Sequence, residues 1–191
     1  MSTEPHTILA KHVEFQASVR HGLYLLFEKL LRWCINPRLR ARLLGMFGAK
    51  MGKNVRIYEI RLFNLEHGFS HLMLADDIHI GPGCCLDLAG PLSIGRRSTL
   101  SPGVTILTHS DPGASHGSKL ATCYPPRTAG VTIGDDCWLG ANSTVLDGVR
   151  INDLVVVAAG SVVTNDTPTG YVVAGVPARL KKTVSMPESN N

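Results

Sequence analysis

Residues 131–166 read VTIGDDCWLGANSTVLDGVRINDLVVVAAGSVVTND and carry an aliphatic side chain at every sixth position. These positions are Ile133, Leu139, Val145, Ile151, Val157 and Val163. An amphipathic helix would repeat its apolar face about every 3.6 residues, and a half-buried strand would alternate with a period of about two. Since six is a multiple of two, each hexad predicts a short strand followed by a corner at a fixed distance.

The same period continues towards the N-terminus, beginning at about residue 54. The fit is loose at Ile57, Phe63 and Phe69 and good at Leu74, Ile80, Leu86 and, after a two-residue slip at LAGP, at Ile94, Leu100 and Ile106. The residue four positions after the aliphatic one is small or β-branched at Cys84, Ser98, Val104, Cys137, Ser143, Val149, Val155 and Ser161. Glycine often follows the aliphatic residue directly, as at Gly81, Gly95, Gly134 and Gly140.

This pattern predicts a mainly β fold, a parallel β-helix of triangular coils. Three hexads joined by tight corners make one coil, and stacked coils bury a column of aliphatic side chains on each side while small residues fill the corners. Each coil covers the backbone edge of its neighbour, so only the two ends need caps. We predict the β-helix over residues 54–182, an N-terminal tail with short helices over 1–53, and a C-terminal tail over 183–191.

The N-terminal segment predicts two short helices within residues 21–48, separated at Pro37, after a loosely held stretch over residues 1–21. Leu23, Phe27, Leu30 and Cys34 fall on one face of the first helix. One interpretation is that both helices cap the open end of the repeat. The other is a membrane-surface segment, because Leu side chains and Trp33 would insert while the cations contact anionic lipid. Those cations are Arg32, Arg38, Arg40 and Arg42.

Charge and cysteine content narrow the class of protein. Residues 1–50 carry eight Lys and Arg against three Asp and Glu, whereas residues 51–191 carry eleven against twelve. The main body therefore has no nucleic-acid signature. Five cysteines without a CxxC pair favour reduced thiols and a cytoplasmic location. The apolar run at 23–27 is interrupted by Glu28 and Lys29, so we expect neither a secretory signal nor a membrane span.

The repeat is interrupted once, by LTHSDPGASHGSKLATCYPPRTAG at residues 107–130. A long excursion from a regular solenoid has to project as a loop, and long loops in compact folds are usually functional. This loop contains Thr108, His109, Asp111 and His116, so the candidate chemistry of the chain is concentrated there.

Three stretches of the C-terminal half, IGDDCWLGANSTVLDGVRIND, VVAAGSVVTNDTP and VVAGVPARLKK, resemble the hexapeptide-repeat acetyltransferases. The likeness is greatest to sugar O-acetyltransferases of the maltose, galactoside and polysaccharide-biosynthesis type. MFGAKMGKNVRI at 46–57 and LDLAGPLSIG also resemble members that decorate exported polysaccharides, and the likeness covers about residues 45–182. It implies a left-handed β-helix, acetyl-CoA as cosubstrate, a sugar or glycan acceptor, and a homotrimer in which the histidine loop of one subunit meets the CoA groove of the next.

The resemblance also implies that a loop histidine acts as general base on the acceptor hydroxyl. Imidazole with an unperturbed pKa of about 6.5 is largely free base at neutral pH. We assign this role to His109, with His116 as the alternative. In the sugar acetyltransferases the histidine falls five positions after the column residue, which here is Asp111, so the spacing in this chain is two residues short. Asp87 and Asp111 are the candidates for orienting the imidazole or, with His116, for binding acceptor hydroxyls.

The positions that match the pantetheine path of these enzymes are Trp138, Ala141, Ala159 and Thr164. Small residues there let the backbone approach the ligand. Asn165 stands where relatives often carry Lys, and Arg179, Lys181 and Lys182 are candidates for contacts with the phosphates of CoA.

Other functions remain open at this stage. A zinc hydration site of the kind found on the same fold needs three converging histidines, and no histidine follows His116, so we expect no metal. An N-acetyltransferase acting on an amino sugar or antibiotic, and a non-catalytic β-helix scaffold, are the alternatives to an O-acetyltransferase. We expect the enzyme in the cytoplasm, with peripheral contact to the inner membrane through residues 21–48 as a further expectation.

Overall fold

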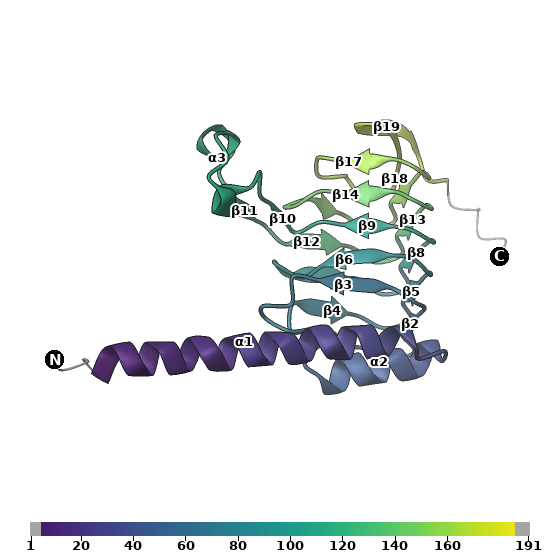
Figure 1. Ribbon diagram of the computed structural model, residues 1–191. Coiled ribbons are helices and arrows are strands. Elements are labelled where there is room, and N and C mark those ends of the chain that lie inside the picture. The colour runs from purple at the N-terminus through teal and green to yellow at the C-terminus, as the bar shows by residue number, and fades with distance from the viewer. Residues whose placement is uncertain (1–4, 186–191) are drawn as a thin grey trace.

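The computed structural model describes the backbone of residues 5–185 and the side chains of residue 16 and residues 18–185. Three sheets, parallel apart from the antiparallel pair β18–β19, form the sides of a prism, two helices lie across its lower end, and an arm projects from the middle (Figure 1). The fold is therefore the predicted β-helix of hexapeptide repeats.

Each sheet takes one strand from each successive coil. The first contains β1 (Lys50–Met51), β4 (Leu72–Leu74), β7 (Leu92–Ile94), β12 (Val131–Ile133) and β15 (Arg150–Ile151). The second contains β2 (Arg56–Ile57), β5 (His79–Ile80), β8 (Thr99–Leu100), β13 (Trp138–Leu139), β16 (Val156–Val157), β18 (Tyr171–Gly175) and β19 (Ala178–Thr183). The third contains β3 (Arg61–Phe63), β6 (Cys85–Asp87), β9 (Thr105–Ile106), β14 (Thr144–Val145) and β17 (Val162–Val163).

The strand register places the six-residue repeat in columns. Ile133 pairs with Ile151 in the first sheet, and Val145 pairs with Val163 in the third. These side chains are at most 1% exposed. The small and β-branched residues predicted for the corners are also buried. The core is therefore a stack of aliphatic layers, as the period predicts.

The first coil departs from the predicted beat by one residue. Leu62, not Phe63, pairs with Leu86 and points into the core, so the prediction for Phe63 was wrong. Phe63 instead pairs with Asp87. Phe69 is buried between strands rather than within one. Pairing of β1 with β4 begins at Lys50, ahead of residue 54.

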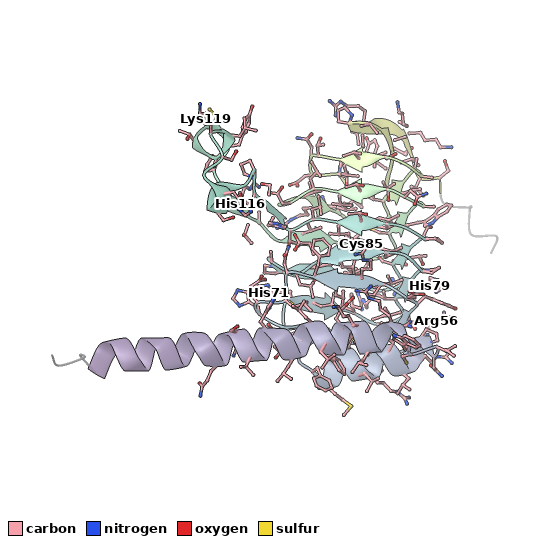
Figure 2. The ribbon with its side chains drawn as sticks, in the orientation of Figure 1. Arg56, His71, His79, Cys85, His116 and Lys119 are labelled. Atoms are coloured by element: carbon pink, nitrogen blue, oxygen red, sulfur yellow. The ribbon has the colours of Figure 1, made fainter. Side chains whose placement is uncertain are left out.

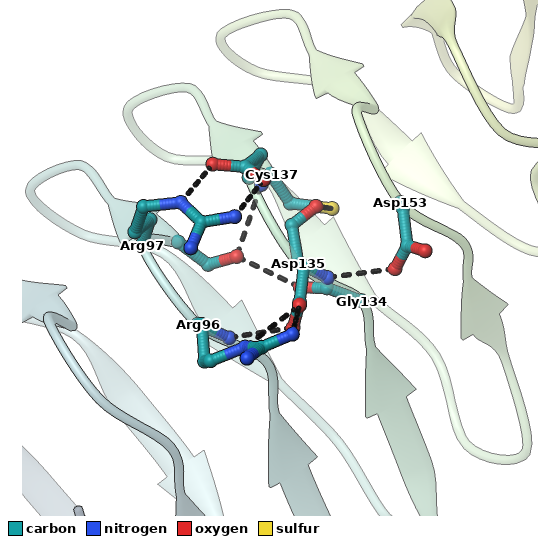
Figure 3. A network of polar contacts seen from close by, with 8 residues as sticks. Arg96, Arg97, Gly134, Asp135, Cys137 and Asp153 are labelled. Carbon is teal, nitrogen blue, oxygen red and sulfur yellow. Dashed lines mark hydrogen bonds and ion pairs between the residues drawn. The ribbon is translucent and has the colours of Figure 1, made fainter.

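The corners between the first and second sheets are tied together by short polar contacts (Figure 3). Asp135 Oδ1 accepts from the N–H of Arg96 at 2.7 Å, and Asp153 Oδ1 accepts from the N–H of Asp135 at 2.8 Å. Arg97 Nη2 donates to Asp136 Oδ2 at 2.6 Å. Carboxylates thus satisfy backbone N–H groups of the neighbouring coil, which holds successive corners in line.

The N-terminal helices close the lower end of the prism. They are α1 (Pro5–Arg32) and α2 (Pro37–Met46). Leu31 and Leu44 belong to the same buried cluster as the aliphatic columns. The guanidinium of Arg40 is buried and donates to the backbone oxygens of Leu31 and Ile57, at 3.1 and 2.7 Å. Packing and hydrogen bonds together fix α2 against the first coil.

The prediction of two short helices after a loose stretch over residues 1–21 was wrong for the first helix, which has 28 residues. The reason is visible in the sequence, since no glycine or proline interrupts residues 6–21 and Pro5 is tolerated in the first turn. The break at Pro37 occurs as predicted. Asn36 caps α2, because its Oδ1 accepts from the N–H of Arg38. No helix in the described part of the chain combines the length and apolarity needed to cross a bilayer.

The predicted loop excursion forms the projecting arm. It contains β10 (His109–Ser110), the 3₁₀ turn η1 (Ala114–His116), α3 (Leu120–Cys123) and β11 (Arg127–Thr128). β10 and β11 form an antiparallel pair, so the arm leaves and rejoins the prism as a two-stranded stem. His109, paired with Thr128, is at the base of this stem, next to the body of the prism.

Candidate active site

The candidate site forms where the strands of the third sheet end and the arm begins. Asn64 follows β3, Asp87 ends β6, and Thr108 lies between β9 and β10. Because parallel strands of successive coils end at the same edge, residues far apart in sequence come together there. His109 is the next residue along the chain, and its imidazole contacts the Asp87 carboxylate.

The Asp87 carboxylate is fully buried, and both its oxygens accept two contacts. Oδ1 accepts from Asn64 Nδ2 at 2.8 Å and from the N–H of Ala89 at 3.0 Å. Oδ2 accepts from the N–H of Thr108 at 2.8 Å and lies 2.5 Å from His109 Nδ1. A buried carboxylate with four donors is held in one orientation.

The protonation state of Asp87 follows from these contacts. Burial raises the pKa of the Asp87 carboxyl, but the hydrogen bonds from His109, Ala89, Asn64 and Thr108 outweigh burial, and its pKa lies below the ordinary aspartate value. Asp87 is therefore ionised at neutral pH and accepts a hydrogen bond from the protonated Nδ1 of His109.

This contact decides which nitrogen of His109 is available for chemistry. With Nδ1 carrying the hydrogen that Asp87 accepts, the lone pair of the neutral ring resides on Nε2. Asn64 Nδ2 lies 3.3 Å from the same Nδ1, but its amide hydrogen is directed to Asp87. The His109 side chain is 33% exposed, so the imidazole is anchored on one side and open on the other. This arrangement is suited to accepting a proton from a bound substrate.

The other two loop candidates occupy different positions. Asp111 Oδ1 accepts from the N–H groups of Gly113 and Ala114, both at 2.8 Å, and these hydrogen bonds lower the pKa of its carboxyl. Asp111 thus shapes the turn that begins the arm. His116 ends η1 with its side chain exposed, and Figure 2 shows it out on the arm. The structure brings Asp87 to His109 and holds neither Asp111 nor His116 in that contact network.

Residues predicted for the CoA path fall on two edges of the prism. Trp138 is 54% exposed on β13, and its Nε1 donates to Ser101 Oγ at 2.9 Å. Ala141 and Ala159 lie at the corner before the third sheet, in neighbouring coils joined by a hydrogen bond from the Gly160 N–H to the Ala141 oxygen. Thr164 and Asn165 follow β17 and lie at the corner after that sheet, the same edge as His109.

A cavity of about 240 Å³ near the C-terminal end brings together two of the predicted residues. Asn165 and Arg179 both line it. Asp166 also lines it, with its Oδ1 accepting from the N–H of Arg150. Lys182 is exposed on β19, opposite Val172 of β18. The cavity therefore brings Arg179 of the basic C-terminal strand near Asn165 at the C-terminal end of the prism.

Sequence reasoning missed Asn64 and assigned no role to Thr108. Asn64 binds the Asp87 side chain, and the buried Thr108 hydroxyl donates to the Asp87 backbone oxygen at 3.2 Å while accepting from the Gly90 N–H at 2.9 Å. Asn64 could not be found from the repeat because the first coil is shifted by one residue. Thr108 offered a signal, since it directly precedes the candidate histidine in the loop.

No group of three or more His, Cys, Asp or Glu side chains in the described part of the chain is arranged to hold a metal ion. The buried Asp87 carboxylate and the His109 imidazole form the candidate acid–base pair of the site. Fold and site together define a parallel β-helix of hexapeptide repeats with an acid–base pair at the root of a projecting arm.

Comparison with known proteins finds a family match for part of the chain. Residues 130–165 match the family described as bacterial transferase hexapeptide (six repeats). A 2,3,4,5-tetrahydropyridine-2,6-dicarboxylate N-acetyltransferase from Staphylococcus aureus is 47% identical over 70 residues, which is 36% of this chain and 29% of that protein. The chain thus spans about three tenths of the length of the curated relatives it matches.

Solved structures extend the likeness over most of the chain. A hexapeptide-repeat-containing acetyltransferase from Vibrio cholerae matches with a TM-score of 0.72 and 20% identity, covering 90% of this chain and 94% of that one. A structure of that protein with acetyl coenzyme A matches at 0.68 and 19% identity, covering 88% and 89%. A maltose O-acetyltransferase from Clostridium difficile matches at 0.68 and 25% identity, covering 84% and 86%. At 19–20% identity, the likeness to the Vibrio protein establishes the shared fold alone.

Proposed function

We propose that this protein is an acetyl-CoA-dependent acetyltransferase that uses His109 as general base, oriented by Asp87. The observation that carries the proposal is the 2.5 Å contact between His109 Nδ1 and the fully buried carboxylate of Asp87. The match of residues 130–165 to the bacterial hexapeptide transferases supports it. So do the acetyl-CoA complex of the Vibrio protein and the name of the Clostridium relative.

The proposed reaction is direct transfer. The acceptor oxygen gives its proton to His109 Nε2 and attacks the thioester carbonyl carbon of acetyl-CoA. The carbon–sulfur bond then breaks, CoA leaves as the thiolate, and the imidazolium returns the proton to the sulfur. Asp87 stays ionised throughout and stabilises the imidazolium. General-base assistance of this kind contributes about 10²–10⁴-fold to the rate.

We propose a hydroxyl of a sugar or polysaccharide precursor as the acceptor. A sugar hydroxyl is a poor nucleophile until a base accepts its proton, and the partly exposed ring of His109 meets this requirement. The arm that begins at His109 would cover the acceptor, and Asp111 and His116 on it are the proposed contacts to acceptor hydroxyls.

N-acetylation of an amino sugar is the second candidate. The Staphylococcus relative is named as an N-acetyltransferase. An N-acyltransferase from Bacillus cereus, solved with dTDP-4-amino-4,6-dideoxyglucose and coenzyme A, shares the fold with a TM-score of 0.57 and 20% identity. The same base would serve an ammonium or amine acceptor, so the geometry of Asp87 and His109 is compatible with both acceptor classes.

We further propose a homotrimer as the active form. Trp138 on β13 of the second sheet, and Ala141 and Ala159 at the corners that follow that sheet, all lie before the third sheet, whereas His109 and Thr164 lie after it. A full side of the prism therefore separates the two groups within one chain. A neighbouring subunit would bring the first group of one copy against the second group of the next, with Asn165, Arg179 and Lys182 near the CoA phosphates.

The test is release of free thiol from acetyl-CoA with hydroxyl-only sugars and, separately, with amino sugars. His109→Ala should lower kcat by about 10²–10⁴-fold. His116→Ala, which removes a proposed acceptor contact, should raise KM for the acceptor and leave kcat close to that of the wild type. Turnover with amino sugars alone would replace O-acetylation by N-acetylation. Unchanged turnover in His109→Ala would remove His109 as the base, and no turnover with any acceptor, with CoA still bound, would favour a non-catalytic scaffold.

A further inference from the structure

The end of the prism closed by α1 and α2 exposes much of the apolar surface of the molecule. Of the sixteen large hydrophobic side chains that are exposed in the described part of the chain, ten fall within residues 19–47. They are Val19, Leu23, Leu25, Leu26, Leu30, Trp33, Ile35, Leu39, Met46 and Phe47. Exposure concentrated in one segment in this way is typical of an interaction surface rather than of ordinary scattered apolar residues.

The exposed residues of α1 form a stripe distinct from its core-facing side. The stripe runs through Val19, Leu23, Leu26 and Leu30 to Trp33 just beyond the helix, at spacings of four and three residues. Trp33 is 86% exposed and the adjacent Ile35 is 95% exposed. The side of α1 that packs on the prism is formed by other residues, namely Tyr24, Phe27, Glu28 and Leu31. Capping the prism therefore does not account for the stripe.

Cations without an ion-pair partner among the described residues surround this surface. Exposed lysines and arginines within residues 18–53 are Arg20, Lys29, Arg38, Arg42, Lys50 and Lys53. The single acidic residue in that range, Glu28, is 4% exposed and bonds Arg32 and the N–H of Leu62. The exposed charge of residues 18–53 is thus entirely positive.

Three of these cations line one cavity of about 390 Å³ between α2 and the first corner of the prism. Arg38 and Arg42 are one helical turn apart, and Lys53 comes from the corner. Ala41, Met51 and Val55 line the same cavity and make part of it apolar. None of the three cationic side chains takes part in an ion pair with a carboxylate of the described residues.

The carboxylates of the next coil are already engaged. Asp76 Oδ1 accepts from the N–H of Lys53 at 2.6 Å, and Asp77 Oδ1 accepts from Asn54 Nδ2 at 2.8 Å. The cavity therefore offers three guanidinium or ammonium groups beside apolar surface, a combination suited to the phosphate of an amphiphile.

We propose that this end of the prism, formed by α1, α2 and residues 50–55, docks on the surface of an anionic phospholipid bilayer. The apolar stripe with Trp33 and Ile35 enters the boundary between headgroups and acyl chains. The cavity of Arg38, Arg42 and Lys53 receives a headgroup phosphate, and the remaining cations add attraction to the negative surface. No residue of this surface belongs to the proposed catalytic or CoA-binding groups, so the inference stands apart from the proposed function.

Charge favours a lipid surface over a second copy of the chain. Pairing the same face of two copies would bring the six exposed cations of each copy together with no exposed acidic partner within residues 18–53, which is unfavourable. An anionic bilayer complements that charge and accepts the apolar residues at the same time.

The experiment is flotation of the full chain with phosphatidylcholine vesicles, with and without phosphatidylglycerol. Binding should require phosphatidylglycerol and should weaken as salt is raised. In a Trp138→Phe background Trp33 is the sole tryptophan, and its emission should shift to the blue on anionic vesicles. Equal binding to both kinds of vesicle, or to neither, would overturn the proposal.

Matched variants separate the contributions. Arg42→Gln should weaken vesicle binding about fivefold, whereas Arg150→Gln, which removes one exposed cation from β15 far along the prism, should leave it unchanged. Trp33→Ser combined with Leu26→Ser should abolish co-flotation of the protein with anionic vesicles. The far-ultraviolet circular dichroism spectrum of this double variant should match that of the wild type. The double variant could still bind vesicles, with inorganic phosphate competing for that binding. This result would overturn docking on the bilayer and would assign the cavity to a soluble phosphate ligand. If the double variant forms a smaller oligomer in solution than the wild type, the stripe would instead be assigned to contact between copies of the chain.

Discussion

Asp87 Oδ2 lies 2.5 Å from His109 Nδ1 although 22 residues separate them in the chain. The β-helix makes this contact by stacking, because β6 and β9 are neighbours in one sheet and their C-terminal ends share one edge. The carboxylate is buried under Thr108 and Asn64 while the imidazole remains partly open. The acid–base pair is therefore a product of the coil repeat together with the one loop that interrupts it.

Asp87→Asn should abolish most of the proposed activity. An amide can present N–H to His109 Nδ1, which would favour the tautomer with hydrogen on Nε2 and remove the lone pair that acts as base. We expect kcat for acetyl transfer to fall about 10²–10⁴-fold, with KM for acetyl-CoA little changed. Thiol release with the accepted sugar measures both.

Asp111→Asn is the control for that variant. The amide oxygen can still accept from the N–H groups of Gly113 and Ala114, so the turn that begins the arm is retained. Its kcat should stay close to that of the wild type, while KM for the acceptor, which Asp111 is proposed to contact, should rise. An equal loss in both variants would show that disturbance of the arm, rather than the tautomer of His109, limits turnover.

Acid should destabilise the protein partly through Asp87. Since the pKa of Asp87 is lower in the folded chain than its ordinary value, its contribution to the free energy of unfolding is fully present above about pH 4. That contribution is lost as pH falls through the depressed pKa. Urea unfolding from neutral pH down to pH 3 should show a shallower loss for Asp87→Asn than for the wild type. Parallel pH profiles would contradict this.

The period of six predicts the sheets because each hexad has to bury one aliphatic residue, and Ile133, Leu139 and Val145 do so. The period fails at the first coil because Leu62 enters the core one residue early. Both Leu62 and Phe63 are apolar, so the sequence pattern does not indicate which of them is buried. His109 was predicted from its place in the loop. Asn64, which donates to Asp87, was not predicted. It comes close to Asp87 because Phe63 pairs with Asp87, and this pairing exists only once the coils are stacked.

Gly134→Ala should destabilise the prism at a corner. A Cβ at this position would lie 2.3 Å from Asp153 Oδ1 and 2.7 Å from the backbone nitrogen of Asp153 in the next coil. Overpacking against backbone costs about 1–3 kcal/mol, so the free energy of unfolding should fall by that amount. Gly22→Ala is the control, since a Cβ there meets nothing within 4 Å and alanine favours a helix interior by about 1 kcal/mol. Chemical unfolding of both variants measures the difference, and similar stabilities would refute the close approach of coils.

Arg40 should be the side chain that most firmly holds the helical cap to the β-helix. Its buried guanidinium donates to the backbone oxygens of Leu31, Cys34 and Ile57, and so connects the end of α1, the link and β2. Arg40→Ala removes the donor to the Cys34 and Ile57 oxygens, whereas the Leu31 oxygen keeps the N–H of Cys34. Each buried acceptor without a partner costs about 1–3 kcal/mol. Arg42→Ala, on the exposed side of the same helix, should change the free energy of unfolding by less than about 0.5 kcal/mol. Hydrogen exchange should show faster exchange in α2 and β2 for Arg40→Ala, with protection of β13 and β16 retained. Uniform loss across the prism would mean that the cap and the coils unfold as one unit.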